Sequence, residues 1–282
     1  MIRIQNIPLP IGGGEEQLKK KAARILGVKP DAIARLSLAR QSIDARKKSD
    51  VHYVCTVDVT LADETGVMAR CRDKNVSLHQ NTPYAFPPVR RTSPLPPVVV
   101  GMGPAGLFAA LYLARNGVPS IVLERGRPVE ERTADVERFW TTGVLNPASN
   151  VQFGEGGAGT FSDGKLTTGT HDSRISTVLR TLAMAGAPED ILYQHKPHIG
   201  TDVLRDVVKT IRLELIRLGC DVRFGHKLSG LGLKDGRVAS LTVDGPTGQY
   251  GLPCDALVLS PGHSARDTFQ MLMDAGVPMV PK

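Results

Sequence analysis

A glycine-rich turn placed between an apolar run and a helical segment constrains the fold of this chain more than any other feature. The motif reads Gly101-Met-Gly-Pro-Ala-Gly106 and directly follows three valines at 98–100. Gly101 permits a tight turn, Gly103 lets the backbone approach a pyrophosphate, and Gly106 lets the next helix pack closely on the strand. The pattern predicts a strand, a turn and a helix that together bind a dinucleotide.

A carboxylate follows this turn at the distance expected for a ribose contact. Pro104 and Ala105 stand in the first turn of the predicted helix, where free N–H groups and a partial positive charge face the phosphates. The next predicted strand leads to Glu124 and Arg125, and Glu124 lies 23 residues after Gly101. Such an acid can accept hydrogen bonds from both ribose hydroxyls and would repel a 2′-phosphate. We therefore place all four residues in the predicted cofactor site.

A second glycine-rich segment lies between residues 153 and 166. Backbone of this kind can wrap closely around a flat ligand or a phosphate and offers several N–H donors. Lys165 could neutralise a pyrophosphate or stabilise an anionic reduced flavin, whereas the alternative for the whole segment is a flexible surface loop. The members that we expect to contact the cofactor are Gly156, Gly157, Gly159, Ser162, Asp163 and Lys165.

Two histidines near these segments are candidates for acid–base chemistry. His198 precedes a helix predicted over 201–218, and His263 follows Gly262. A histidine satisfied by structural hydrogen bonds is the alternative for each. The catalytic residues therefore stay unassigned, with His198, His263 and Lys165 as candidates. The sequence shows neither a Ser-His-Asp order nor metal-ligand spacing, and we expect no metal site.

A proline-rich stretch over 86–97 divides the α/β chain into two parts. Residues 1–85 predict a small basic α/β module of ferredoxin-like type. Residues 98–282 predict a Rossmann-like domain, in which a parallel sheet carries an inserted β-hairpin or meander. The periodicity predicts strands over 2–7, 37–46, 51–61, 98–100, 120–123, 222–224 and 256–259, helices over 15–26, 104–116 and 201–218, and a hairpin over 231–243 with its turn at Asp235-Gly236.

The net charge of +7 is unevenly distributed. Residues 1–97 hold 16 Lys and Arg against 9 Asp and Glu, whereas residues 98–282 hold 19 of each kind. Such a surplus could mark a surface for nucleic acid. Because no nucleic-acid motif or interleaved aromatic residue accompanies it, we expect a solvated face and not a nucleic-acid partner. The expected partner is a small-molecule substrate, and the sequence leaves the oligomeric state open.

Compartment and membrane signals point to a cytoplasmic protein. The four cysteines lie far apart without a Cys-x-x-Cys pair, and polar residues interrupt any apolar segment near Met1. Residues 95–114 carry no charge over a length that could span a bilayer. They contain three prolines and the glycine turn, which a strand and a helix explain better than one continuous span.

The region from Val98 to Gly126, which ends in Glu-Arg-Gly, resembles the N-terminal FAD fingerprint of the glutathione-reductase-like flavoproteins. The later helix, strand and hairpin follow that family's order. Ser260-Pro-Gly-His263 resembles its second FAD contact, usually Ala-Thr-Gly, with Gly262 as the glycine that approaches the cofactor. The whole chain also resembles a group of bacterial proteins described as FAD-dependent dehydrogenases, through Ser42-Ile-Asp-Ala-Arg46, residues 150–166 and Lys196-Pro-His-Ile-Gly-Thr-Asp202.

The resemblance implies a non-covalent FAD that exchanges hydride or electrons with an unknown small molecule. It also allows NAD(P)H as an electron donor in the full-length protein. Members of that group are about twice as long, so the resemblance implies an N-terminal half that is truncated at Lys282. Three alternatives stay open: a non-catalytic nucleotide-binding fragment, an NAD-only Rossmann dehydrogenase, and a polyanion-binding module with a regulatory flavin.

Overall fold

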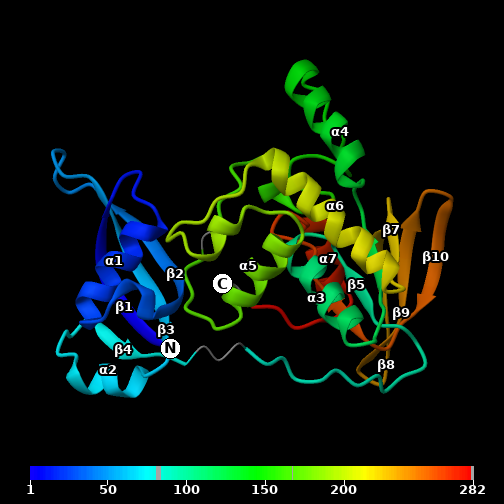
Figure 1. Ribbon diagram of the computed structural model, residues 1–282. Coiled ribbons are helices and arrows are strands. Elements are labelled where there is room, and N and C mark those ends of the chain that lie inside the picture. Colours follow the sequence, from blue (N-terminus) through cyan, green and yellow to red (C-terminus); the bar gives the residue numbers. More distant parts are fainter. Residues whose placement is uncertain (81–83, 167, 281–282) are drawn as a thin grey trace. The chain divides into compact units, whose positions relative to one another are not determined.

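The computed structural model describes residues 1–80, 84–166 and 168–280, and the chain forms two compact units (Figure 1). The predicted boundary near residue 85 stays a prediction, and the first segment of the first unit ends at Tyr84. The prediction of one continuous second domain over 98–282 does not agree with the two units, because the chain returns to the first unit after residue 164. The end at Lys282, where truncation is expected, lies outside the described residues. The first unit comprises Met1–Tyr84, Lys165–Ala183 and Pro188–His198, and the second comprises Ala85–Gly164, Met184–Ala187 and Ile199–Lys282.

The first unit contains a four-stranded antiparallel sheet in the order β2-β3-β1-β4. β2 begins at Ile33, earlier than the predicted residue 37, because it pairs with β3 as far as the Ile33–Leu61 partners. The short elements α2 and β4 were not predicted. The elements are β1 (Ile2–Pro10), α1 (Glu15–Leu26), β2 (Ile33–Asp44), β3 (His52–Leu61), α2 (Glu64–Arg70) and β4 (Val76–Leu78), with a 3-10 turn at Pro30–Ala32.

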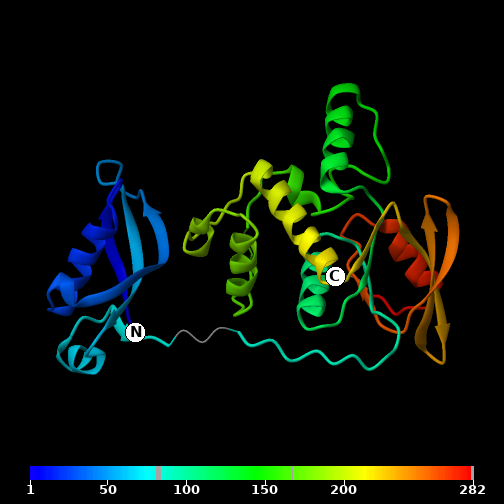
Figure 2. The same cartoon turned by 45° about the vertical axis from the view of Figure 1, so that its right-hand side comes forward.

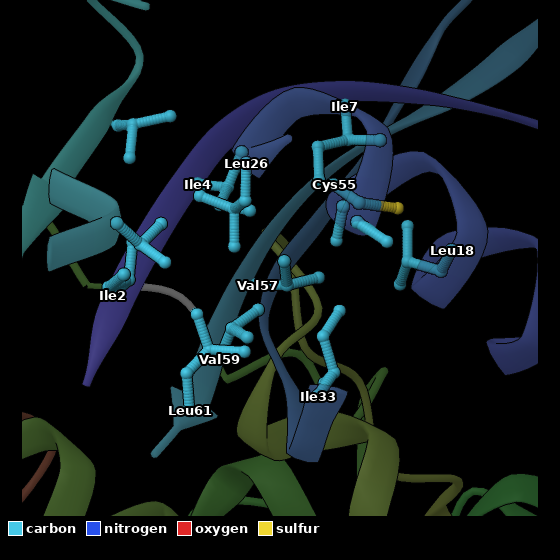
Figure 3. Packing of buried hydrophobic residues seen from close by; sticks show 14 of the residues in the cluster. Ile2, Ile4, Ile7, Leu18, Leu26, Ile33, Cys55, Val57, Val59 and Leu61 are labelled. Atoms are coloured by element: carbon cyan, nitrogen blue, oxygen red, sulfur yellow. The ribbon is translucent and has the colours of Figure 1, made fainter. Parts of the chain in front are cut away.

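The core of this unit is apolar and lies between the sheet and α1 (Figure 3). Alternate residues of the strands face it, as the period-two pattern predicts: Ile4 on β1 and Val57 on β3 are fully buried. Leu18 and Leu26 of α1 pack against the same cluster. α1 ends at Leu26 and is followed by Gly27 at φ 66°, the left-handed conformation that commonly terminates a helix.

The returning segment covers part of the exposed edge of this sheet. The Gln41 N–H of edge strand β2 donates to the Tyr193 carbonyl at 2.8 Å, and the His195 N–H donates to the Gln41 carbonyl at 2.9 Å. Lys165 and His198 form an isolated antiparallel bridge in the same unit. Since an open strand edge has unpaired N–H and C=O groups, this pairing explains why the segment joins the first unit. The segment contains most of α5 (Ile175–Met184) and the 3-10 helix Glu189–Leu192.

The second unit contains a four-stranded parallel sheet in the order β11-β5-β6-β7, which confirms the predicted parallel sheet. Its central strands are short and apolar, and Val98 and Val99 are fully buried. Such runs are typical of parallel strands that are covered on both faces. The elements are β5 (Val98–Val100), α3 (Pro104–Arg115), β6 (Ile121–Glu124), α6 (Thr201–Arg217), β7 (Asp221–Phe224) and β11 (Leu257–Leu259).

An antiparallel meander of β8 (Lys227–Lys234), β9 (Arg237–Gly245) and β10 (Gly248–Pro253) lies between β7 and β11 in the chain. The predicted turn at Asp235-Gly236 is confirmed, since both residues have positive φ, 51° and 71°, as a type I′ hairpin turn requires. The third strand of the meander was not predicted individually.

The described part of the second unit also contains α4 (Val129–Thr142), the 3-10 helix Ala158–Phe161 and α7 (Arg266–Asp274). The outer part of α4 projects away from the parallel sheet in both views (Figures 1 and 2). The predicted connector is extended and contacts the second unit. The centroid of its Phe86 ring lies 4.6 Å from the centroid of the Tyr112 ring on α3. Within the described residues, no helix combines the length and the apolarity needed to cross a membrane.

Candidate functional site

A cavity of about 250 Å³ opens in the second unit where β5, β6 and β11 end. The carboxyl edge of a parallel sheet is where ligands bind in folds of this kind. The lining joins five segments of the chain: the turn after β5, the end of β6, the second glycine-rich segment, the start of β8 at residues 226–228 and the residues after β11. The predicted site residues in the lining are Gly101, Gly103, Pro104, Glu124, Arg125, Gly157, Gly262 and His263.

The turn after β5 requires glycine at two positions for packing reasons. Gly101 has φ 93°, and a Cβ atom there would lie 2.1 Å from the Ser260 carbonyl oxygen. A Cβ atom on Gly106 would lie 1.8 Å from the Gly101 carbonyl oxygen. Gly103 differs, because a Cβ atom there would meet only the Gly157 Cα, at 3.9 Å. Its missing side chain therefore leaves the cavity wall as bare backbone instead of relieving a clash.

The N-terminus of α3 lies at this wall. Gly103 occupies the N-cap position and Pro104 the first helical position. Leu107 N–H already donates to the Gly103 carbonyl, and the N–H groups before it have no acceptor within the helix. Ala105 is exposed, whereas Gly106 is buried and packs the helix against the strand. The helix start thus offers amide donors and the positive end of its dipole to an anion.

Glu124 lies at the end of β6 with only 4% of its surface exposed. One carboxylate oxygen, Oε2, accepts the Met102 N–H at 2.7 Å, and Oε1 accepts the Gly126 N–H at 2.8 Å. An ionised carboxylate has about four acceptor positions, so two hydroxyl donors can still be accommodated. The structure shows a role that the sequence did not suggest, since Glu124 holds the backbone of the turn after β5 at Met102 and the backbone after β6 at Gly126.

The second glycine-rich segment packs backbone to backbone on the first. A Cβ atom on Gly157 would lie 2.9 Å from Pro104 Cδ and 3.4 Å from Gly103 Cα. The Gly156 N–H donates to the Met102 carbonyl at 2.9 Å. This close approach brings Gln152, Phe153, Gly154, Gly157 and Ala158 into the lining of the cavity.

The other predicted members of that segment lie elsewhere. Gly156 packs against Thr160 and Val208, and Ser162 lines a separate cavity of about 200 Å³ beside α4. A Cβ atom on Gly159 would meet open space, and Asp163 is exposed. The catalytic candidates Lys165 and His198 belong to the first unit, whereas exposed His263 lines the cavity of the second.

Buried charges next to the cavity were not predicted. Glu155 is fully buried, and its Oε2 accepts the Val129 N–H at 2.7 Å and an Arg212 N–H at 3.0 Å. Among the described residues its Oε1 has no hydrogen-bond partner. Burial raises the pKa of Glu155 to about 7, although the Val129 N–H and Arg212 oppose the shift. Arg212 also donates to Glu130 at 2.7 Å, and this bond lowers the pKa of Glu130 to about 2.

The sequence contains only a weak indication that Arg132 is buried. Arg132 is fully buried and shares the inner face of α4 with Val129 and Val136, three and four residues away. That spacing is helical, but arginine inside an apolar stripe is usually explained by a solvated head group. The partners of Arg132 are carbonyls of a loop whose conformation the sequence pattern does not specify, and those of Glu155 lie on two helices that are distant in the sequence.

Comparison with known proteins leaves the chemistry open. Residues 1–60 match a family model described as a domain of unknown function, DUF8436. The chain is 46% identical over 287 aligned residues to an uncharacterized protein of Clostridium beijerinckii, covering 99% of this chain and 52% of that protein. It therefore spans about half the length of this curated relative.

Similar solved structures include Thermovibrio ammonificans THI4, with 19% identity, a TM-score of 0.42, and coverage of 64% of this chain and 62% of that one. A flavocytochrome c3 fumarate reductase has 18% identity, a TM-score of 0.37, and coverage of 57% and 32%. A 3-ketosteroid dehydrogenase from Rhodococcus jostii has 15% identity, a TM-score of 0.34, and coverage of 58% and 45%. With TM-scores below 0.5, these similarities do not assign a function to the cavity.

Proposed function

We propose that this chain is the dinucleotide-binding part of an FAD-dependent oxidoreductase. In this proposal the enzyme passes hydride or electrons between a small molecule and a non-covalent FAD, with NAD(P)H as a possible electron donor. The single observation that supports it best is the shared lining of one cavity. The glycine turn at the start of α3 and the carboxylate of Glu124 meet there, at the carboxyl edge of a parallel sheet.

The lining fits the adenosine diphosphate end of FAD. Glycines at 101, 103, 157 and 262 leave bare backbone along the lining, so a diphosphate can approach the amide groups at the start of α3. The Arg125 guanidinium lies 4.5 Å from the Phe153 ring centroid, and both side chains line the cavity, where a flat base can stack. A volume of about 250 Å³ is below that of a typical whole-ligand pocket, which supports a partial site.

FAD is favoured over NAD by the resemblance of two segments. The Glu-Arg-Gly sequence at 124–126 ends the first FAD-like region, and Gly262 of the second region lines the same cavity. Bound FAD would supply the redox chemistry. The protein would hold the ribose with Glu124 and the diphosphate with the start of α3. Of the three catalytic candidates, His263 next to Gly262 is the one in the lining, where it could hold or release a proton.

The proposal is tested by flavin binding to the purified chain. We expect flavin absorption that bleaches with a chemical reductant, and quenching of FAD fluorescence on titration. Glu124→Gln should weaken FAD binding by about 100-fold, since charge-assisted hydrogen bonds to the ribose are lost. The matched control is Glu131→Gln on α4, whose side chain is 61% exposed and should leave affinity unchanged.

Each other outcome contradicts the proposal in a different way. A colourless protein that binds NAD in place of FAD would support the NAD-only hypothesis. A folded chain that binds neither nucleotide would reject dinucleotide binding by this cavity. Unchanged FAD affinity in Glu124→Gln would show that the flavin binds elsewhere.

A further inference from the structure

We infer that Arg132 is a positioning residue for the loop at residues 150–155, which forms one wall of the cavity. Arg132 lies on α4, and Gln152, Phe153 and Gly154 of the loop line the cavity. The inference rests on the proposed function, because it concerns how the same site is kept in shape for a dinucleotide.

The guanidinium of Arg132 is bonded to main-chain carbonyls along the loop. Its Nε donates to the Asn150 carbonyl at 2.9 Å, and Nη2 donates to the Val151 carbonyl at 3.1 Å. Its Nη1 donates to the Glu155 carbonyl at 2.5 Å and, at 3.4 Å, to the Gly154 carbonyl. A planar group with five N–H donors in a fixed arrangement can hold several carbonyls at once, which a single ammonium cannot.

These bonds bracket the residues that face the cavity. Asn150 and Val151 precede Gln152 and Phe153, and Glu155 follows them. Gly154 is at φ 120°, and a Cβ atom there would lie 2.5 Å from Arg132 Cδ. The loop is therefore held at both ends and pressed against the aliphatic part of the same side chain.

The loop also binds back to the helix. The Glu155 carboxylate accepts the N–H of Val129, the first residue of α4, and Arg212 of α6 holds the same carboxylate. A carboxylate at a helix N-terminus is stabilised by the helix dipole. The Phe161 ring centroid lies 4.6 Å from Arg132 Cζ and covers the guanidinium. Contacts in both directions fix the position of the loop relative to α4.

Burying a guanidinium is costly unless its partners compensate. Burial lowers the pKa of Arg132 to about 10, while the charges of Glu124 and Glu155 oppose the shift. The group therefore stays charged at neutral pH and keeps all its donors. An apolar side chain would fill the same space without this cost, but it could not fix four carbonyls. The buried arginine is explained if the backbone conformation of residues 150–155 determines the shape of the cavity.

The test compares substitutions at two arginines of α4. Arg132→Lys keeps the charge and loses the fixed set of donors, and Arg132→Met removes both. Arg138→Lys and Arg138→Met are the matched controls, because Arg138 is exposed on the same helix. For each variant, FAD affinity is measured well below its unfolding midpoint, and hydrogen exchange of residues 150–157 is measured without FAD.

We expect both Arg132 variants to bind FAD about tenfold more weakly, because the loop must then be ordered on binding. Exchange at 150–157 should accelerate, whereas exchange in β1 and β3 of the first unit should not change. The Arg138 variants should match the unmodified protein in both measurements. Loss of stability alone would lower the unfolding midpoint without changing affinity in the folded protein.

Two results would overturn the inference. Full FAD affinity in Arg132→Lys would show that charge alone matters, and unchanged loop exchange in both variants would show that Arg132 does not order the loop. If Arg132→Met does not fold, Arg132→Lys decides the outcome. If the unmodified chain does not bind FAD, the proposed function fails, but the exchange measurement still tests the role of Arg132.

Discussion

The interiors of the two units differ in the kinds of side chain that they bury. The described core of the first unit is a continuous apolar cluster, in which Ile2, Ile4, Val57 and Val59 are fully buried (Figure 3). The second unit has an apolar sheet as well, but it also buries charged groups beside the cavity. The buried charged residues described in the second unit are Glu124, Arg132, Asp135, Glu155 and Arg212.

The two kinds of interior contribute differently to stability and to the proposed function. An apolar core stabilises a small unit through the area removed from water and needs no directional partners. Buried charges are weak evidence for stability, since well-packed apolar residues often do as well or better. Buried charges do fix the orientation of the groups around them, because each buried N–H or carboxylate oxygen needs a hydrogen-bond partner. Under the proposed function, the charged interior of the second unit is the part that keeps the cavity in shape for a ligand.

The largest effect is expected from breaking the charged cluster at Arg212. At pH 8, above the Glu155 pKa of about 7, Arg212→Met would leave the Glu155 carboxylate buried without its ion pair to Arg212, which should destabilise the second unit by about 3–5 kcal/mol. Urea unfolding followed by hydrogen exchange of β5 and β6 measures this. Arg217→Met, exposed at the end of the same helix, is the control and should change stability little. Equal stability of the two variants would contradict a paired buried charge.

A pH dependence is expected from Glu155. Its pKa is raised from 4.5 to about 7, so the folded state binds an extra proton between these values. The stability contribution is fully present below pH 4.5 and is lost as the pH rises through 7. Glu155→Gln, which cannot ionise, should lack this loss, so its stability relative to the unmodified protein should increase between pH 5 and pH 8.

The size of that relative gain is a few kcal/mol at most. It is measured by urea unfolding of both proteins at the two pH values. Parallel pH profiles would mean that Glu155 does not titrate in this window and is held ionised by Arg212.

The smallest effect is expected in the apolar core. Ile4→Val removes one buried methyl group and should destabilise the first unit by about 1 kcal/mol at any pH between 5 and 8. Hydrogen exchange of β1 and β3 reports this unit. Ile43→Val is the control, because Ile43 is 64% exposed and should cost little. A strong pH dependence of the Ile4→Val effect would remove the contrast between the two interiors.

Features encoded by neighbouring residues were predicted well. The turn at 101–106, the strand ending at Glu124 and the hairpin turn at 235–236 follow from local preferences, because positive φ, helix starts and apolar runs need only adjacent residues. The short helix α2 and strand β4 were missed because few residues carry their pattern. Helix α4 was missed because its inner face mixes valine with arginine and aspartate.

The sequence alone therefore predicted the glycine turn at 101–106, Glu124 and the parallel strands, because the preferences that determine them act over a few neighbouring positions. Only folding brought the glycine segment at 153–157 onto that turn, and only folding returned residues 188–198 to the edge of β2. It also buried Arg132 among carbonyls about twenty residues away in the chain. Contacts of this kind are decided by which backbone groups remain unpaired and which surfaces can approach closely, and no local pattern records either.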